Sequence, residues 1–196
     1  METNATKQRV VDALVSLVAE VPLDKISVGS LAARAGVSRQ TFYYHFRNIY
    51  DVFLWAVTSR MKYPDGKLSG KVAPSPTRCV VDLCHSLREN RELVYAFMGY
   101  YRVELREDIR DYLYNVCRIN LLYLMSDHAT EEDVEIAAHF HVDGFIGIIN
   151  HWLETGMRED MADMVESLIQ TMKTSLRPDM LERLEENCPK PRKTKA

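Results

Sequence analysis

Residues 26–46, ISVGSLAARAGVSRQTFYYHF, decide the fold of the N-terminal part of this 196-residue chain. Ser27 and Ser38 each precede a short helical stretch, and each can accept a hydrogen bond from the free N–H groups at its start. Gly36 stands between the two stretches, where a tight turn needs a residue that tolerates a positive φ. Ala32, four residues earlier, is small enough for two helices to cross closely. The stretch therefore predicts two short helices joined at a steep angle.

The side chains of this stretch separate into a core face and an exposed face. The apolar set that we assign to the core is Val28, Leu31, Ala35, Val37, Phe42 and Phe46. The polar set that we assign to DNA contact is Ser38, Arg39, Gln40, Thr41, Tyr43, Tyr44 and His45. In a helix-turn-helix, side chains near the start of the second helix reach base edges, whereas hydroxyl groups and helix N-termini suit phosphates. The pattern favours DNA binding, and an αα-corner in a helical protein is the alternative.

The same residues resemble the DNA-binding signature of the TetR family of transcriptional regulators. Two segments carry the resemblance, Ala33-x-x-Gly36-Val37-Ser38 and Phe42-Tyr43-Tyr44-His45-Phe46, and it covers roughly residues 5–57. The resemblance implies that Phe42 and Phe46 belong to the core. It also implies which side chains meet DNA: Arg39, Gln40, Thr41 and Tyr44 face bases or nearby phosphates, and Tyr43 and His45 contact the backbone.

One position departs from the family pattern. The family usually has a lysine three residues after the closing phenylalanine, and this chain has Ile49 there. A phosphate contact is lost at that position, which should lower the salt slope of DNA binding by about one unit. Arg47 lies close enough to take over this contact, and we include it among the DNA-binding residues.

Outside this stretch the sequence predicts helices and no strand, so the expected fold class is all-α. The apolar residues between Val10 and Val21 have helical spacing, and Pro22 ends that helix. Thr130 is placed to cap a later helix with Asp133, and Gly156 to end it. Further helices are expected at 49–62, 77–89, 91–101, 107–126, 160–175 and 179–186.

A loop-rich stretch at residues 64–76, which contains three prolines, divides the chain. The sequence predicts a three-helix helix-turn-helix head at residues 1–62 and a helical regulatory and dimerisation domain at 63–188. A disordered basic tail is expected at 189–196. Residues 1–60 carry seven Lys or Arg and five Asp or Glu, whereas the whole chain has a net charge of −3, so the head is the positive part.

The composition excludes several classes of protein. No run of uncharged apolar residues is long enough for a membrane span, and residues 1–10 lack the apolar core of a signal peptide, so we expect a cytoplasmic protein. His139 and Asp143 stand four residues apart without an evident third ligand. We therefore expect no metal, no cofactor and no catalytic site, and the chain shows no enzyme motif. The cysteines form no C-x-x-C pair and are expected to be free thiols: Cys79, Cys84, Cys117 and Cys188.

Residues 140–168 suggest an interface between two copies of the chain. Gly144 and Gly147 would let another helix approach closely, and two successive apolar helices suit a four-helix interface. This part resembles the body of a TetR-like subgroup that includes regulators of dihydroxyacetone metabolism. A homodimer matches the two half-sites of an operator, and the alternative is a monomer core. The residues that we assign to the interface are Phe145, Ile148, Ile149, Trp152, Met161, Met164 and Leu168.

Members of the family usually hold a small effector inside the body. Aromatic side chains with a few polar neighbours are the candidates here, since a buried tyrosine hydroxyl needs a partner, although such a stripe also suits a core. They are Tyr95, Phe97, Met98, Tyr101, Tyr112, Tyr123, Phe140 and His141. The expected partners are double-stranded operator DNA, a second copy of the chain and an unknown small molecule. A partner protein that controls the body is the alternative to the small molecule.

Overall fold

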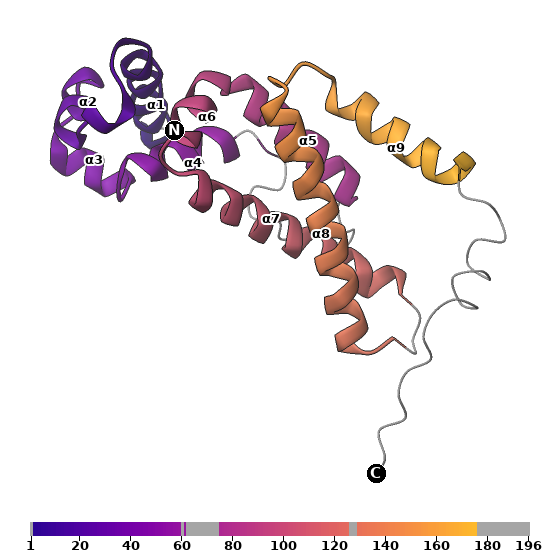
Figure 1. Cartoon of the computed structure of the whole chain (residues 1–196). Coiled ribbons are helices and arrows are strands. Elements are labelled where there is room, and N and C mark those ends of the chain that lie inside the picture. The colour runs from indigo at the N-terminus through magenta and orange to yellow at the C-terminus, as the bar shows by residue number, and fades with distance from the viewer. Residues whose placement is uncertain (1, 60, 62–74, 126–128, 176–196) are drawn as a thin grey trace. The chain divides into compact units, whose positions relative to one another are not determined.

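The computed structural model describes residues 2–59, 61, 75–125 and 129–175. Every regular element in these ranges is a helix, which confirms the expected all-α class (Figure 1). The helices up to α8 belong to one compact unit, residues 1–158, and α9 belongs to a second, residues 159–196. In chain order the elements are α1 (Glu2–Glu20), the 3₁₀ helix η1 (Leu23–Lys25), α2 (Val28–Arg34), α3 (Arg39–His45), α4 (Ile49–Thr58), α5 (Pro76–Glu89), α6 (Arg91–Met98), α7 (Arg102–Leu124), α8 (Glu131–Glu154) and α9 (Met161–Ser175).

Three helix boundaries differ by three or more residues from the sequence expectation. α4 ends at Thr58 rather than residue 62, and α6 ends at Met98 rather than residue 101. α7 begins at Arg102, five residues earlier than expected and after a connection of only three residues. In this connection the N–H of Tyr101 donates to the carbonyl of Phe97 at 2.7 Å. The expected helix at 179–186, the tail at 189–196, Cys188 and residues 64–74 of the expected loop lie outside the described ranges.

The first four helices enclose a small core. α1 contacts α2, α3 and α4, and it contributes the fully buried Val10 and Leu14. A surface contact fixes α2 on α1, because the guanidinium of Arg34 donates to a carboxylate oxygen of Glu20 at 2.6 Å and to the hydroxyl of Ser16 at 2.6 Å. α2 is thereby held in place before the turn that leads into α3.

A cluster of aromatic rings joins α4 to α6 and to the residue that precedes α7. Phe53 of α4 stacks on Phe97 of α6 with ring centroids 4.4 Å apart and an interplanar angle of 12°. Tyr50, one turn earlier in α4, stacks on Tyr101 at 5.0 Å. The hydroxyl of Tyr50 also donates to Asp108 of α7 at 2.5 Å. The helix that follows the helix-turn-helix is therefore packed directly against the body.

α7 and α8 form the most extensive helix pair of the described residues. Their apolar faces bury Leu113 and Val116 on α7 and Val142 and Ile146 on α8. Polar contacts flank this core, because Arg118 of α7 donates to two carboxylates of α8, Glu131 and Glu135. None of the helices described is long and apolar enough to cross a membrane.

Both ends of α8 have the residues that the sequence predicts. The N–H of Thr130 donates to the carboxylate of Asp133 at 2.8 Å, and the N–H of Asp133 donates back to the hydroxyl of Thr130 at 3.2 Å. This reciprocal pair is a capping box, as expected. At the other end Gly156 has a φ of 88°, a left-handed conformation that ends a helix and favours glycine. The expected cap and stop of α8 are confirmed.

We expect the pairing of α7 and α8 to weaken in acid through Glu135. Hydrogen bonds from Tyr114 and then from Arg118 hold the pKa of the Glu135 carboxyl below its ordinary value of 4.5. A group whose pKa is lowered by folding stabilises the fold above its unfolded pKa, and this contribution is lost as the pH falls through the folded pKa. The melting temperature of the wild type should therefore fall below pH 4.5 more steeply than that of Glu135→Gln. If the melting temperatures of the two proteins fell equally with pH, Glu135 would not contribute to the loss of stability in acid.

Candidate functional site

The turn between α2 and α3 has the geometry that its sequence predicts. Gly36 adopts a φ of 65°, and the N–H of Val37 donates to the carbonyl of Ala32 at 3.0 Å. Ser38 caps α3, because its hydroxyl accepts a hydrogen bond from the N–H of Thr41 at 2.9 Å. Ser27 caps α2 in the same way through Ser30. The turn and both caps therefore fix the direction in which α3 leaves the head.

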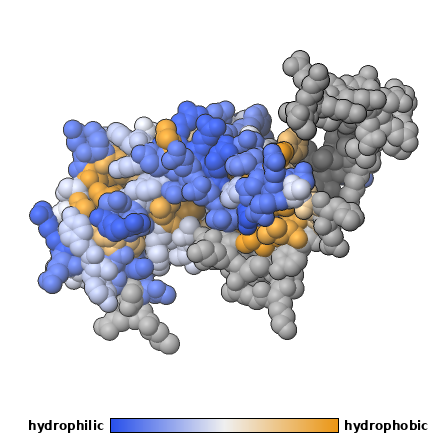
Figure 2. Space-filling model, turned by 90° about the horizontal axis from the view of Figure 1, so that it is seen from below, coloured by the Kyte–Doolittle hydropathy of each residue, from blue (hydrophilic) through white to orange (hydrophobic). Residues whose placement is uncertain are grey.

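α3 has one buried face and one exposed face. Phe42 is fully buried, and Phe46 directly after the helix is also buried. The other side carries Tyr44, which is 81% exposed, beside Tyr43 and the exposed pair Arg39 and Gln40. Tyrosine rings with this much free surface have no role in the core of the subunit. Figure 2 shows hydrophilic side chains over much of the surface of the end of the molecule that α2 and α3 form.

The side chain of Arg39 lies over the backbone of α2. A Cβ atom built on Gly29 would be 2.4 Å from Nη2 of Arg39, so the end of this flexible side chain would have to shift. Gly29 therefore provides the space in which this guanidinium lies. Sequence reasoning did not single out Gly29, because it stands in an ordinary helical position and its role depends on the distance to the next helix.

The remaining candidate residues of the head differ in exposure. Thr41 and His45 are half-buried, and Ser38 is exposed although its hydroxyl is engaged in the cap. Arg47 is exposed, and its guanidinium lies 3.4 Å from Asp51 in an i,i+4 pair. Of the expected core residues, Val28 and Val37 are only half-buried, because they lie at the start of α2 and in the turn.

The expected interface residues on α8 lie on two different faces. Ile149 is 1% exposed and Trp152 is fully buried, with the guanidinium of Arg88 over its ring at 5.3 Å. A side chain without exposed surface offers nothing to a partner, so the assignment of these two residues to an interface is wrong. Phe145 and Ile148 are half-buried and keep some free surface.

The expected interface residues on α9 belong to the second unit. Met161 and Met164 stand one turn apart on this helix, and their assignment to an interface stays a prediction. The side chain of Leu168 lies outside the described part of the structure.

A second face of α8 is largely exposed in the part of the subunit that the structure describes. It carries Phe140, which is 77% exposed, and Ile136 one turn earlier. Gly144 and Gly147 continue the same face, and a Cβ atom on either would meet nothing within 4 Å. Figure 2 shows a hydrophobic patch on this side of the molecule, in the region that α7 and α8 form. The sequence identified both glycines, but not the two large apolar residues as part of their face.

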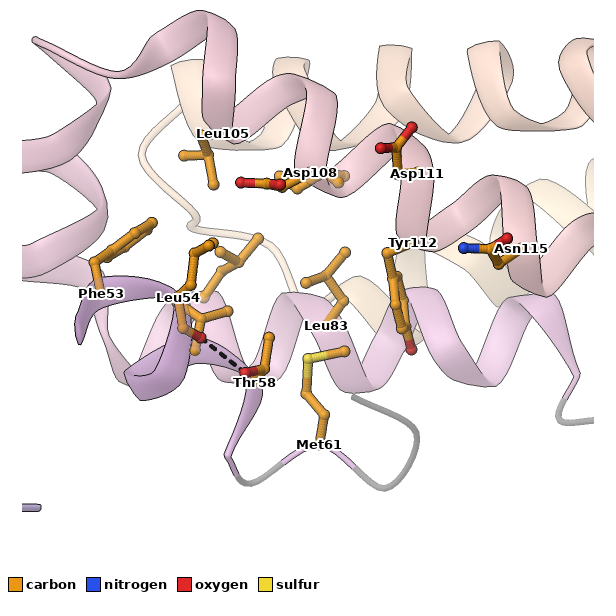
Figure 3. Close-up of a pocket in the computed structure, with 13 residues that line it drawn as sticks. Phe53, Leu54, Thr58, Met61, Leu83, Leu105, Asp108, Asp111, Tyr112 and Asn115 are labelled. Atoms are coloured by element: carbon orange, nitrogen blue, oxygen red, sulfur yellow. Dashed lines mark hydrogen bonds between the residues drawn. The ribbon is translucent and has the colours of Figure 1, made fainter. Parts of the chain in front are cut away.

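A cavity of about 330 Å³ lies among α4, α5 and α7 (Figure 3). The first wall is α4 with Phe53, Leu54 and Val57, and the second is α5 with Leu83 and Leu87. α7 closes it with the apolar Leu105 and Ile109 and with the polar Asp108, Asp111, Tyr112 and Asn115. The cavity is partly open to solvent, since Asp108, Asp111 and Asn115 are exposed. A hollow with mostly apolar walls and a few polar groups is the usual form of a small-molecule site.

Most of the expected pocket residues do not line this cavity, and only Tyr112 does. Phe97 and Tyr101 belong to the aromatic cluster. The hydroxyl of Tyr95 donates a hydrogen bond to the carbonyl of Leu153. Met98 is half-buried outside the cavity lining, Phe140 and His141 line a shallow hollow at the start of α8, and the side chain of Tyr123 is outside the described residues. Five of the expected pocket residues therefore pack elsewhere or face solvent, and they are not part of this cavity: Tyr95, Phe97, Tyr101, Phe140 and His141.

The described cysteines of the body are buried thiols with low reactivity. Cys79, Cys84 and Cys117 are buried free thiols, as expected. Burial raises the pKa of the Cys84 thiol to about 12 and that of Cys117 to about 11, so neither forms the reactive thiolate near neutral pH. In the part of the chain that the structure describes, no three His, Cys, Asp or Glu side chains are grouped so that they could hold a metal ion.

Two solved structures share this arrangement of helices. One is the dihydroxyacetone kinase operon activator DhaS, with 13% sequence identity, a TM-score of 0.63 and coverage of 92% of this chain and 97% of that chain. Another is the fatty acid degradation regulator FadR from Bacillus halodurans, with 18% identity, a TM-score of 0.55 and coverage of 88% and 96%. At these identities the likeness shows a shared fold. Among curated proteins, none matches the sequence.

Two family models match the sequence itself. Residues 10–55 match the model described as bacterial regulatory proteins of the tetR family, which covers the helix-turn-helix. Residues 75–174 match the model described as a transcriptional regulator C-terminal region of the TetR type, and this match alone spans more than half of the chain. The chain therefore belongs to the TetR family of DNA-binding transcriptional regulators.

Proposed function

We propose that this regulator binds an operator as a homodimer, with α3 of each copy in the major groove, and that a small molecule in the α4–α5–α7 cavity changes its DNA affinity. The observation that carries the proposal is the exposed side of α3. Arg39, Gln40, Tyr43 and Tyr44 all face solvent on a helix that is fixed by Ser38 and by buried rings. We keep the division into a DNA-binding domain at residues 1–62 and a regulatory domain at 63–188 as part of the proposal.

The exposed side chains of α3 divide into two roles. Arg39 and Gln40 lie at the start of the helix, where a guanidinium or an amide can form paired hydrogen bonds with a base edge. Tyr43, Tyr44 and Arg47 suit phosphates and sugars, which position the protein without reading the sequence. The half-buried Thr41 and His45 complete the contact set that we propose, together with the N–H of Ser38.

Replacing Gly29 with alanine should lower sequence discrimination without weakening the fold. The new methyl group would displace the guanidinium of Arg39, and an alanine within a helix is more favourable than glycine by up to about 1 kcal/mol. We expect an unchanged or higher melting temperature, together with a loss of discrimination between the operator and a mismatched duplex that is smaller than the loss in Arg39→Ala, because the guanidinium is only shifted. Arg39→Ala removes the guanidinium and should lose about 1–3 kcal/mol of this discrimination. Full discrimination in Gly29→Ala would show that the observed position of Arg39 does not matter for DNA.

The free face of α8 supports a homodimer. Its glycines allow another helix to approach closely, and its exposed Ile136 and Phe140 are apolar surface that a partner would cover. Two copies related by a two-fold axis would place two α3 helices on successive major grooves. We therefore propose Ile136, Phe140, Gly144 and Gly147 as interface residues beside Phe145 and Ile148, with Met164 and Leu168 of α9 as further candidates.

The cavity favours a small-molecule effector over control by a partner protein alone. A tightly packed body would have favoured the partner protein, whereas a space of about 330 Å³ next to α4 has room for a ligand. Because α4 follows α3 after only three residues, a ligand that favours one position of α4 also favours one position of the head.

The test of the DNA-binding proposal is a binding titration with the duplex that flanks the gene of this protein. It is carried out with competitor DNA at two salt concentrations. We expect binding that survives the competitor and weakens with salt, because phosphate contacts release counterions. Binding that is seen only at low salt and is lost to competitor would mean that the operator lies elsewhere or that a partner protein is required.

A further inference from the structure

The polar lining of the α4–α5–α7 cavity is acidic. Asp108 and Asp111 line it from α7, and no Lys, Arg or His side chain is among the described residues that line it. Its other polar groups are neutral, and one of them, the hydroxyl of Thr58, donates within α4 to the carbonyl of Leu54 at 2.8 Å. Figure 3 shows Asp108 and Asp111 on the α7 side, above the apolar side chains of α4 and α5. The cavity therefore combines an apolar floor with a negatively charged edge.

Asp108 also connects this cavity to α4. Its carboxylate accepts the hydrogen bond of the Tyr50 hydroxyl, with the two oxygens 2.5 Å apart. Burial, the hydrogen bond to Asp108 and the nearby charge of Glu104 all raise the pKa of Tyr50, so the phenol stays protonated and remains a donor. Tyr50 holds α4 through this bond and through its stacking on Tyr101. Anything that competes for the carboxylate of Asp108 therefore acts on the position of α4.

We propose that the effector of this regulator is an apolar organic cation, an amine or quaternary ammonium compound whose charge lies at Asp108 and Asp111 while its apolar part fills the space between α4 and α5. This inference rests on the proposed effector site and names the class of ligand for it. An anionic ligand of the same shape would bring a third negative charge to the two carboxylates, which disfavours it. A neutral ligand would gain the apolar contacts without the charge pair.

The same geometry gives the cation a way to act on the head. A bound ammonium group donates to the carboxylate of Asp108 or neutralises its charge. The hydrogen bond from the Tyr50 hydroxyl to Asp108 is then weakened or broken. α4 is then held on α7 by fewer contacts, and α4 continues into α3 through a connection of three residues. A ligand that binds more tightly to the protein in which Tyr50 is released shifts the equilibrium toward that state.

The test uses octylammonium, octan-1-ol and octanoate, which share one alkyl chain and differ in charge. Calorimetric titration of the full chain should show octylammonium binding about tenfold or more tightly than octanoate, with octan-1-ol in between. Asp108→Asn should weaken the binding of octylammonium by about three- to tenfold and leave the affinity for octan-1-ol unchanged. Glu107→Gln is the matched control, since it removes a carboxylate from the same helix outside the cavity lining, and it should change neither affinity.

Tyr50→Phe separates this role from a merely structural one. It removes the hydroxyl that competes for Asp108, so octylammonium should bind more tightly, in the opposite direction to Asp108→Asn. If both variants weakened all three compounds equally, the residues would only support the fold and the inference would be overturned. Equal or tighter binding of octanoate by the wild type would overturn it as well.

The failure of the ligand class can be told from the failure of the effector site. The DNA titration is repeated with each of the three compounds. If octan-1-ol or octanoate binds as tightly as octylammonium and changes DNA affinity, the effector site stands and the cation is ruled out. If none of the three binds the protein, the cavity is not an effector site for compounds of this kind, and the cationic effector falls with it. Specific DNA binding without ligand would still stand in both cases.

Discussion

Phe53→Ala should lower the free energy of unfolding by about 3–5 kcal/mol, the cost that is typical of a fully buried phenylalanine. Phe53 has no exposed surface, stacks on Phe97 at 4.4 Å and forms part of the cavity wall. Its removal leaves a void between α4 and α6 that neighbouring side chains fill only in part. Urea unfolding followed by circular dichroism measures the change as a shift of the midpoint.

The matched control for Phe53→Ala is Val103→Ala, since Val103 is 65% exposed at the start of α7. It should change the free energy of unfolding by less than about 0.5 kcal/mol. A loss of under about 1 kcal/mol in Phe53→Ala would mean that the contact between α4 and the body is looser than described. In that case α4 could not transmit a change at the cavity to the head.

Gly147→Glu should convert the proposed dimer to a folded monomer. Within the subunit a side chain at this position meets no atom within 4 Å, so the fold has room for it. In a two-fold interface the same change places a charge from each copy against the closely packed partner, and like charges in an interface cost several kcal/mol. We expect the mass from light scattering to halve, and affinity for an operator with two half-sites to fall by about 100-fold or more.

Val103→Glu serves as the control for Gly147→Glu, because it adds the same charge at another exposed position, outside α8. It should leave both the mass and the affinity for DNA unchanged. A Gly147→Glu protein with the mass of the wild type would exclude this face of α8 from the interface. Phe140→Glu would then show whether the first half of the helix forms a contact instead.

The helix-turn-helix could be predicted from the sequence because its determinants are local. Ser27, Gly36 and Ser38 each act within four residues of their own position, through a cap or a positive φ. The position of Arg39 over Gly29 could not be predicted in the same way, since it depends on the distance between two helices. Local signals thus gave the location of the DNA-binding surface, and the structure adds its detail.

The cavity and the free face of α8 could not be predicted because they depend on which helix faces meet across long separations. α8 is apolar on two sides, and its spacing does not tell the side of Ile149, which is buried in the subunit, from the side of Phe140, which is exposed. Aromatic content suggested a pocket at Phe97 and Tyr101, yet these rings join α4 to the body. The cavity wall comes from leucines and from the carboxylates of α7, which look like ordinary core and surface residues in the sequence.

Selection of bound sequences from a pool of random duplex DNA, with the wild type and Arg39→Ala compared, shows whether α3 reads DNA. The wild type should enrich one sequence with two half-sites related by two-fold symmetry, with centres about one helical turn of DNA or a multiple of it apart. Arg39→Ala should enrich a sequence that is less defined at the base pairs that Arg39 reads. Failure of the wild type to enrich any sequence, or an identical sequence from both proteins, would contradict the reading of DNA by α3 as described.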